Sequence, residues 1–201
     1  MSSIHIATLN INGMTSQTKI VMLETFVRAW DIDILLVQEV TQHVLHDIRG
    51  YTTRYNIGAN GRGTAIIAKE GIVLENVTCI PPGRAIAARF NKCWIVNVYA
   101  PSGTARRHER EMFYNSELPQ LLIDTSRQIL MAGDFNSTLQ QRDTTGALNY
   151  SRALSDLKGM ELKHARNSTE ERPGYTHYAP NGASRLYRIY LTKELYAQNG
   201  G

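Results

Sequence analysis

The chain has 201 residues, 42% of them hydrophobic, and its 22 Lys and Arg exceed 18 Asp and Glu, which gives a net charge of +4 and a pI of about 9.1. This length and apolar content exclude a small scaffold that needs disulfides or metals to fold, since chains of this size bury most of their unfolded surface. No apolar run approaches the roughly 18 residues of a membrane span and no signal-peptide pattern follows the first residue, so we expect one soluble intracellular domain, nuclear or cytoplasmic.

The two cysteines and the net positive charge exclude only a few classes of protein. Cys79 and Cys93 fit neither a zinc spacing nor a disulfide framework and lie in apolar, strand-like stretches, so we predict reduced core thiols. The excess of basic residues is compatible with a polyanionic partner, although many proteins with no nucleic-acid role are equally basic.

The first forty residues predict a strand, an amphipathic helix and a second strand. Ile4 to Ile11 alternates and is rich in β-formers, while Thr18 to Trp30 carries its apolar residues at helical spacing. Ile32 to Val37 is a nearly continuous apolar run, as expected for a strand covered on both faces. It ends abruptly in Gln38 and Glu39.

The middle of the chain predicts a β-meander. Turn signals at Asn60-Gly61, Pro81-Pro82-Gly83 and Asn91-Lys92 separate short β segments. These segments are Tyr51 to Tyr55, Thr64 to Ala68, Ile72 to Cys79, Arg84 to Phe90 and Cys93 to Tyr99.

The second half alternates helices with strands. Thr104 to Leu122 predicts a charged helix that is kinked or broken near Pro119, where a backbone N–H is missing. The further predicted elements are a buried strand at Gln128 to Ala132, a helix at Ser151 to Leu157, and strands at Tyr175 to Tyr178 and Ser184 to Thr192. The order predicts an α/β fold, a four-layered sandwich in which two mixed sheets face each other and helices cover the outside.

Polar residues follow four of the apolar strands, and a rigid strand end holds a side chain in a cleft with little positional freedom. The four ends are Thr8-Leu9-Asn10-Ile11-Asn12-Gly13, Val37-Gln38-Glu39, Asn97-Val98-Tyr99-Ala100-Pro101-Ser102-Gly103 and Ala132-Gly133-Asp134-Phe135-Asn136. With these motifs in this order, the sequence from about Ile4 to Leu195 resembles the exonuclease/endonuclease/phosphatase superfamily. Within it, the chain is most similar to the endonuclease domains of non-LTR (LINE-type) retrotransposons, which are related to apurinic/apyrimidinic endonucleases.

The resemblance implies hydrolysis of phosphodiester bonds with Mg²⁺, or with Mn²⁺, as the cofactor. It implies that Glu39 is the metal ligand, and a carboxylate suits Mg²⁺, which needs only one or two protein oxygens. It further implies that Asp134 orients or activates the attacking water, that Asn136 holds a phosphate oxygen and that the Tyr99 hydroxyl reaches the scissile phosphate. The alternatives are a surface carboxylate for Glu39, a capped turn for Asp134 and Asn136, and simple packing for Tyr99.

The same resemblance implies roles for two further groups of residues. Asn10 matches the catalytic amide of the first motif, and Asn12 stands where relatives carry an acidic metal ligand, although a turn residue before Gly13 is an equal alternative. Three arginines on the charged helix are candidates for phosphate contacts of the duplex, namely Arg106, Arg107 and Arg110. Charge runs on helices are usually solvated faces, which is the slightly favoured alternative.

The pattern fails near the C-terminus. In relatives, a strand that reads Arg-Leu/Ile-Asp supplies an aspartate, and a later Ser-Asp-His motif supplies the histidine of the catalytic base system. Here Tyr187 stands at the place of that aspartate, and no histidine follows His177. We expect a shortened or decayed copy that lacks C-terminal strand structure, with His177 as a less favoured substitute base.

Several functions therefore remain open. We expect a DNA-nicking endonuclease of a non-LTR retrotransposon, impaired in this chain, with double-stranded DNA and the reverse transcriptase domain of the same element as partners. The alternatives are a catalytically inactive DNA-binding or decayed remnant, an apurinic-site repair endonuclease, and, less favoured, a phosphoinositide or sphingomyelin phosphodiesterase.

Overall fold

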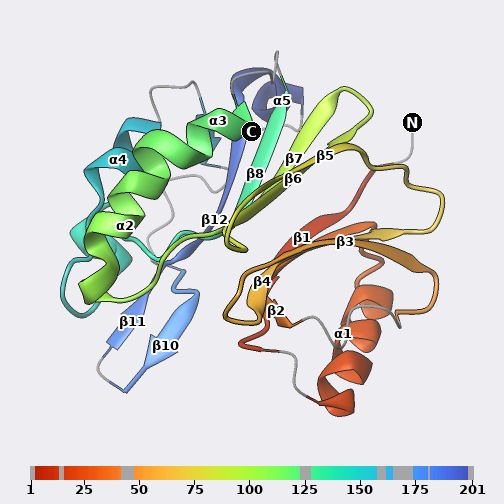
Figure 1. The fold of residues 1–201 in the computed structure, drawn as a ribbon, viewed down its shortest axis with the longest axis horizontal. Helices are drawn as coiled ribbons and strands as arrows, with labels where there is room; N and C mark the ends of the chain where they lie inside the picture. Colours follow the sequence, from red (N-terminus) through yellow and green to blue (C-terminus); the bar gives the residue numbers. More distant parts are fainter. Residues whose placement is uncertain are drawn as a thin grey trace.

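The computed structural model describes residues 3–13, 16–41, 48–122, 128–157, 162–164, 174–180 and 182–198. Within these ranges the chain forms two large sheets and a small hairpin (Figure 1). No helix of the described ranges is long and apolar enough to cross a membrane.

The first sheet is built from the N-terminal third of the chain. Its strands, in spatial order, are β1 (Ile6–Asn10), β2 (Ile34–Thr41), β4 (Arg62–Lys69) and β3 (Tyr51–Ile57). β1 runs parallel to β2, whereas the other pairs are antiparallel. Helix α1 (Gln17–Ala29) makes the crossover between the two parallel strands and covers one face of the sheet.

The second sheet contains six strands. Their spatial order is β5 (Glu75–Ile80), β6 (Ala85–Phe90), β7 (Cys93–Tyr99), β8 (Ile129–Asp134), β12 (Tyr187–Thr192) and β9 (Leu162–His164). β7 and β8 are parallel, and the segment between them carries α2 (Arg107–Met112) and α3 (Leu118–Leu122). The described residues also form the helices α4 (Arg152–Asp156) and α5 (Lys193–Gln198) and the hairpin of β10 (His177–Ala179) and β11 (Gly182–Ser184).

Three apolar clusters hold four layers together, as the sequence predicted. One cluster lies between the two sheets and includes Leu36 and Ile66, and a second lies between the first sheet and α1 and includes Leu35 and Val37. A third joins the second sheet to the π-helical turn Phe113–Glu117, to α3 and to α4 (Figure 1). Neighbouring residues of β2 thus point into different clusters, which explains why this strand is apolar on both faces.

Several details differ from the sequence-based prediction. The predicted meander is divided: β3 and β4 join the first sheet, whereas β5, β6 and β7 join the second. The helix continues through Pro119 because a π-helical turn at Phe113–Glu117 directly precedes it and accommodates the missing N–H. Cys79 is exposed rather than in the core, because β5 is an edge strand whose residues face solvent.

The C-terminal segments also differ. The strand predicted at Ser184 to Thr192 is two strands, β11 and β12, interrupted at Arg185 and Leu186. Strand β9 and helix α5 were not predicted. Strand β2 continues to Thr41, so Gln38 and Glu39 lie within it and not after its end. Most of the other boundaries agree within two or three residues.

Candidate active site

The four polar strand ends lie at one edge of the sandwich. Asn10 is the register partner of Gln38 where β1 and β2 run parallel, and Tyr99 is the partner of Asp134 where β7 and β8 run parallel. Because parallel strands end at the same edge of a sheet, each pair delivers two polar positions to one place. Contacts between the sheets bring the two pairs together.

Asn10 joins one carboxylate from each sheet. Its Nδ2 donates to Glu39 Oε1 at 3.1 Å and to Asp134 Oδ2 at 2.9 Å. A single amide group thus holds two acidic side chains that are far apart in sequence, in a position where they would otherwise repel each other. Asn10, Glu39 and Asp134 form the acidic centre of the site.

A buried amide pair fixes Glu39 relative to the second sheet. Gln38 Nε2 donates to Asn97 Oδ1 at 2.7 Å, and Asn97 Nδ2 donates to the carbonyls of Val37 and Ala65. Both side chains are fully buried between the sheets. Glu39 itself lies at an irregularity in the β2–β4 register and has a φ of 57°, so the local backbone departs from the strand and turns this side chain to the edge.

The turn after β8 is held by its own side chains. The Asn136 N–H donates to Asp134 Oδ1 at 2.9 Å, and Asn136 Nδ2 donates to the Ala100 carbonyl at 2.9 Å. Between them, Phe135 is fully buried and packs edge-on against Tyr190, at 5.1 Å between ring centroids. The buried aromatic anchors the turn while its two polar neighbours face the site.

Three strands of the second sheet place a row of side chains across the site. Tyr99 on β7, Asp134 on β8 and Tyr187 on β12 are register neighbours, with Asp134 in the middle. The start of β12 is tied to the hairpin because Thr176 Oγ1 accepts the N–H groups of Leu186 and Tyr187, at 2.9 and 3.0 Å. His177 follows directly and begins strand β10.

The acidic centre shifts the ionisation of its neighbours. Burial raises the pKa of Asp134, and the Glu39 charge adds to this, against the stabilising hydrogen bonds from Asn136 and Asn10. Burial, together with the charges of Asp134 and Glu39, raises the pKa of Tyr187 to about 12. Burial and the same two carboxylates raise the pKa of Tyr99. Both phenols are therefore neutral hydrogen-bond donors at physiological pH.

Two arginines that the motifs did not include lie beside these groups. Arg62, at the start of β4, forms an ion pair with Glu39 through Nη1 and Oε2. Arg84 is buried, stacks over the Tyr99 ring at 5.5 Å from its centroid and pairs with Glu109 on α2 at 3.1 Å. The site thus combines two carboxylates, two neutral phenols and two guanidinium groups.

The other predicted residues are distributed differently. Asn12 is exposed in the turn after β1, where its N–H donates to Asn10 Oδ1 at 2.8 Å, so it lies next to the acidic centre. Arg106 and Arg107 are exposed at the start of α2. Arg110 is a correction: it is 1% exposed and donates to the carbonyls of Pro101 and Gly103, so in this structure it supports the loop after Tyr99 and is not open to a phosphate.

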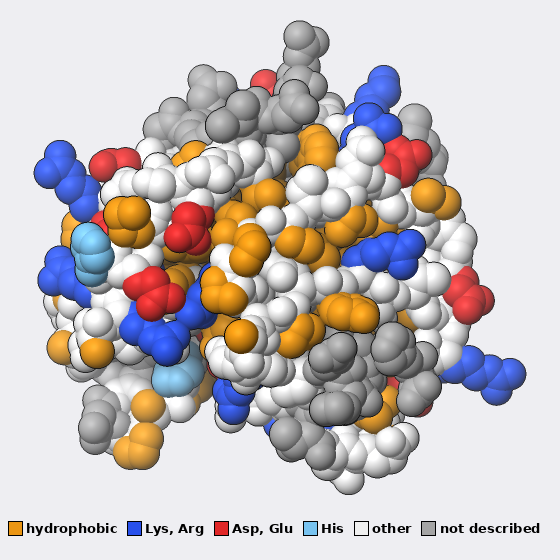
Figure 2. Space-filling view, in the orientation of Figure 1, with side chains coloured by type: hydrophobic (Ala, Val, Ile, Leu, Met, Phe, Trp, Pro, Cys, Tyr) orange, Lys and Arg blue, Asp and Glu red, His pale blue; other side chains and the backbone are white. Residues whose placement is uncertain are grey.

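The basic surface is accordingly not continuous on the face seen in Figure 2. Charged side chains there lie mainly around the rim, and hydrophobic side chains gather over the middle. The net charge of +4 therefore does not by itself mark a DNA-binding face.

Some of these contacts left a signal in the sequence. Asn97 is a polar residue in the otherwise apolar run Trp94 to Val98, which indicates a buried hydrogen-bonding role. Arg62 follows the Asn60-Gly61 turn signal, but nothing in the local sequence shows that it faces Glu39 on the neighbouring strand β2. The pairing depends on the strand register and on the irregularity at Glu39.

Comparison with known proteins places this geometry in a family. The Endonuclease/Exonuclease/phosphatase family matches residues 7–201. The chain is also similar to the Transposon TX1 uncharacterized 149 kDa protein of Xenopus laevis, with 23% identity over 223 residues that span 98% of this chain but 16% of that protein.

Two solved structures illustrate the likeness in fold. An AP endonuclease from Archaeoglobus fulgidus has a TM-score of 0.81 at 19% identity, over 97% of this chain and 89% of that one. The endonuclease domain of TRAS1, a telomere-specific non-LTR retrotransposon, has a TM-score of 0.64 at 15% identity, over 95% of this chain and 85% of that one. At these identities the likeness shows a shared fold.

Proposed function

The chain belongs to the endonuclease/exonuclease/phosphatase family, and on this premise we propose that it is the DNA-nicking endonuclease domain of a non-LTR retrotransposon, with impaired activity. The observation that carries the proposal is the convergence of Glu39 and Asp134 on the Asn10 amide, with Tyr99 beside them. Similarity to a transposon protein and to a retrotransposon endonuclease domain supports this choice of element. The nick would supply a 3′ hydroxyl to a reverse transcriptase domain of the same element.

The donor set fits Mg²⁺. The described residues contain no cluster of three or more His, Cys, Asp or Glu side chains that could hold a metal. Mg²⁺ needs no such cage, because it retains several waters and binds through one or two carboxylates together with substrate phosphates. Glu39, with the neighbouring Asn12 side-chain oxygen, would hold it. When bound, it would neutralise the charge that develops on the phosphate oxygens.

Phosphodiester hydrolysis also requires an activated water and hydrogen-bond donors for the phosphate oxygens, and the protein's own side chains can supply both. Asp134 is fixed through both carboxylate oxygens and has a raised pKa, so it is placed to orient a water molecule and to accept its proton. The neutral Tyr99 hydroxyl can donate to a phosphate oxygen, and the buried Arg84 below its ring adds positive charge. Asn136 would position the same phosphate from the turn after β8.

Tyr187 is the reason to propose impairment. The family resemblance implies an aspartate at this position, and a phenol with a pKa of about 12 cannot take over its negative charge. Losing a positioned proton-transfer group costs about 10² to 10⁴ in rate. We therefore propose nicking at least about a hundredfold slower than that of a relative with an aspartate at this position.

The same residue favours a second candidate. A chain with Tyr187 beside Asp134 could keep the fold and bind duplex DNA without cleaving it. An apurinic-site endonuclease is the third candidate, supported by the likeness in fold to an AP endonuclease.

Plasmid nicking separates these candidates. Purified protein is incubated with supercoiled plasmid in Mg²⁺ or in chelator, beside Glu39→Gln and a matched control, Glu75→Gln, whose carboxylate pairs with Arg89 on β6. We expect slow nicking that requires Mg²⁺, is lost in Glu39→Gln and is retained in Glu75→Gln. DNA binding without nicking would favour the inactive candidate. Cleavage restricted to a duplex that contains an abasic site would favour the repair enzyme.

A further inference from the structure

The ion pair between Arg62 and Glu39 joins two residues with different access to solvent. The Arg62 side chain is 46% exposed, whereas that of Glu39 is 15% exposed. The carboxylate is also held from the other side by Asn10. The guanidinium can therefore leave the pair toward solvent, while the carboxylate stays in place.

The backbone aims Arg62 at this position. The turn before it is closed by hydrogen bonds from the Gly58 N–H to the Arg62 carbonyl, at 2.9 Å, and from the Arg62 N–H to Asn60 Oδ1, at 3.1 Å. The next residue, Gly63, lies so close to β3 that an added Cβ would be 1.8 Å from the Asn56 carbonyl oxygen. The start of β4 is therefore fixed, and only the long side chain of Arg62 is free to move.

In the ion pair, Arg62 occupies the Glu39 carboxylate that a divalent cation would need as its ligand. Glu39 Oε1 accepts from Asn10 and Oε2 accepts from Arg62, so both oxygens already have a donor. A divalent cation on Oε2 would face the positive charge of Arg62 directly, and two cations at one oxygen repel. A phosphate group offers the guanidinium an alternative partner of matching geometry.

We propose that Arg62 competes with the divalent cation for Glu39, and that a nucleic-acid phosphate relieves this competition by binding the guanidinium. This inference rests on the proposed function, because it takes Glu39 as the metal ligand. It makes the cation and the DNA bind cooperatively. Free protein would hold the cation weakly, and protein with DNA would hold it more tightly.

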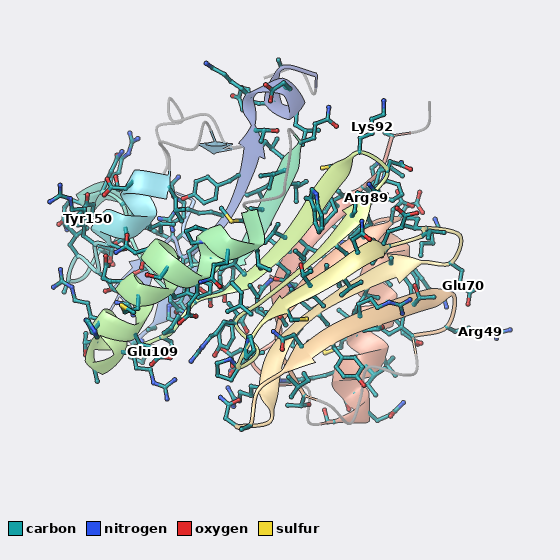
Figure 3. The ribbon with its side chains drawn as sticks, turned by 45° about the horizontal axis from the view of Figure 1, so that its top comes forward. Arg49, Glu70, Arg89, Lys92, Glu109 and Tyr150 are labelled. Carbon is teal, nitrogen blue, oxygen red and sulfur yellow. The ribbon has the colours of Figure 1, made fainter. Side chains whose placement is uncertain are left out.

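Mn²⁺ binding, followed by the loss of its electron paramagnetic resonance signal, tests this without measuring cleavage. Arg62→Gln is compared with Arg89→Gln, whose side chain is similarly exposed at 43% and also pairs with a glutamate. Arg89 lies near the β6–β7 turn, at the opposite end of β6 from the Tyr99 edge of the sheet; Figure 3 shows it far across the view from Glu109.

We expect Arg62→Gln to bind Mn²⁺ about two- to fivefold more tightly than the parent, the size of a partly exposed ion pair. Arg89→Gln and the charge-preserving Arg62→Lys should bind as the parent does. A phosphorothioate duplex, which resists cleavage, should tighten Mn²⁺ binding to the parent more than to Arg62→Gln.

The outcomes separate this inference from the proposed function. If Glu39→Gln binds Mn²⁺ as well as Glu75→Gln does, the metal site and the Arg62 inference both fail. If Glu39→Gln loses binding but Arg62→Gln binds no more tightly than Arg89→Gln, the Arg62 inference alone is overturned. A purely structural role for Arg62 would lower the urea midpoint of Arg62→Gln and leave its Mn²⁺ affinity unchanged, which also overturns the inference.

Discussion

Replacing Asp143 by alanine should destabilise the fold more than any surface change. Asp143 is completely buried; it pairs with Arg185 and, at 3.2 Å, with Arg188, and it accepts the N–H groups of Leu139 and Gln140 at 2.9 and 3.2 Å. Its removal leaves the Arg188 guanidinium, whose side chain is 1% exposed, without a carboxylate. Breaking a buried pair in this way costs about 3–5 kcal/mol.

Urea unfolding measures this cost. With an m-value of roughly 2–3 kcal/mol per molar for a domain of this size, the midpoint of Asp143→Ala should fall by about 1–2.5 M. The matched control is Asp156→Ala, because Asp156 is 68% exposed and lies 3.7 Å from Arg152 on α4. Such a surface pair contributes within about 0.5 kcal/mol. Equal midpoints for the two variants would refute the assignment of Asp143 as the buried centre of this network.

Three further predictions follow from the site and its surroundings. Tyr187→Asp should raise Mg²⁺-dependent nicking about tenfold or more, whereas Tyr187→Phe should not, and equal rates for both would contradict the reason given for impairment. Burial opposes ionisation of Asp143, but the Leu139 N–H, Arg188 and Arg185 outweigh it and hold its pKa below the usual value. Its contribution to stability is therefore present above about pH 4 and lost as the pH falls further, so the urea midpoint of the parent should drop more steeply in acid than that of Asp143→Asn. Replacing Arg106 and Arg107 together by glutamine should lower the salt dependence of duplex binding by about one to two phosphate contacts, measured by fluorescence anisotropy beside Arg152→Gln; an unchanged slope would show that this end of α2 does not contact DNA.

The sequence predicts the layers well because hydrophobic periodicity reports burial directly. The apolar run of β2 and the helical spacing of α1 each mark a surface that must be covered, and both elements form where expected. How the strands divide between the two sheets is not visible in that pattern. β4 and β5 are both short β segments beside a turn, and only long-range packing decides that they belong to different sheets.

The sequence predicts the site residues that belong to a motif. It does not predict the residues that long-range strand pairing brings to the site. Asn10 and Asp134 are the last residues of their strands and Glu39 follows the apolar run of β2, so their convergence could be anticipated from the sequence, although their chemical roles stay predictions. Arg110 shows the limit of reading charge alone, since its burial depends on carbonyls that the loop after Tyr99 presents to it. Arg62 reaches the site through an irregular strand pairing that leaves no local signal.

The ends of the nicked strand test the central claim most directly. Supercoiled plasmid is treated with protein and Mg²⁺, and the nicked product is isolated. It is then incubated with a DNA polymerase and nucleotides, and extension of the nicked strand is measured. We predict slow formation of nicks that are extended without further processing, because the proposed attack of water on the phosphate breaks the P–O3′ bond and leaves a 3′ hydroxyl and a 5′ phosphate. We also predict that Asp134→Ala forms no nicks. Nicks that appear equally with Asp134→Ala would contradict the assignment of Asn10, Glu39 and Asp134 as a phosphodiesterase centre, and nicks that cannot be extended would contradict the proposed supply of a 3′ hydroxyl.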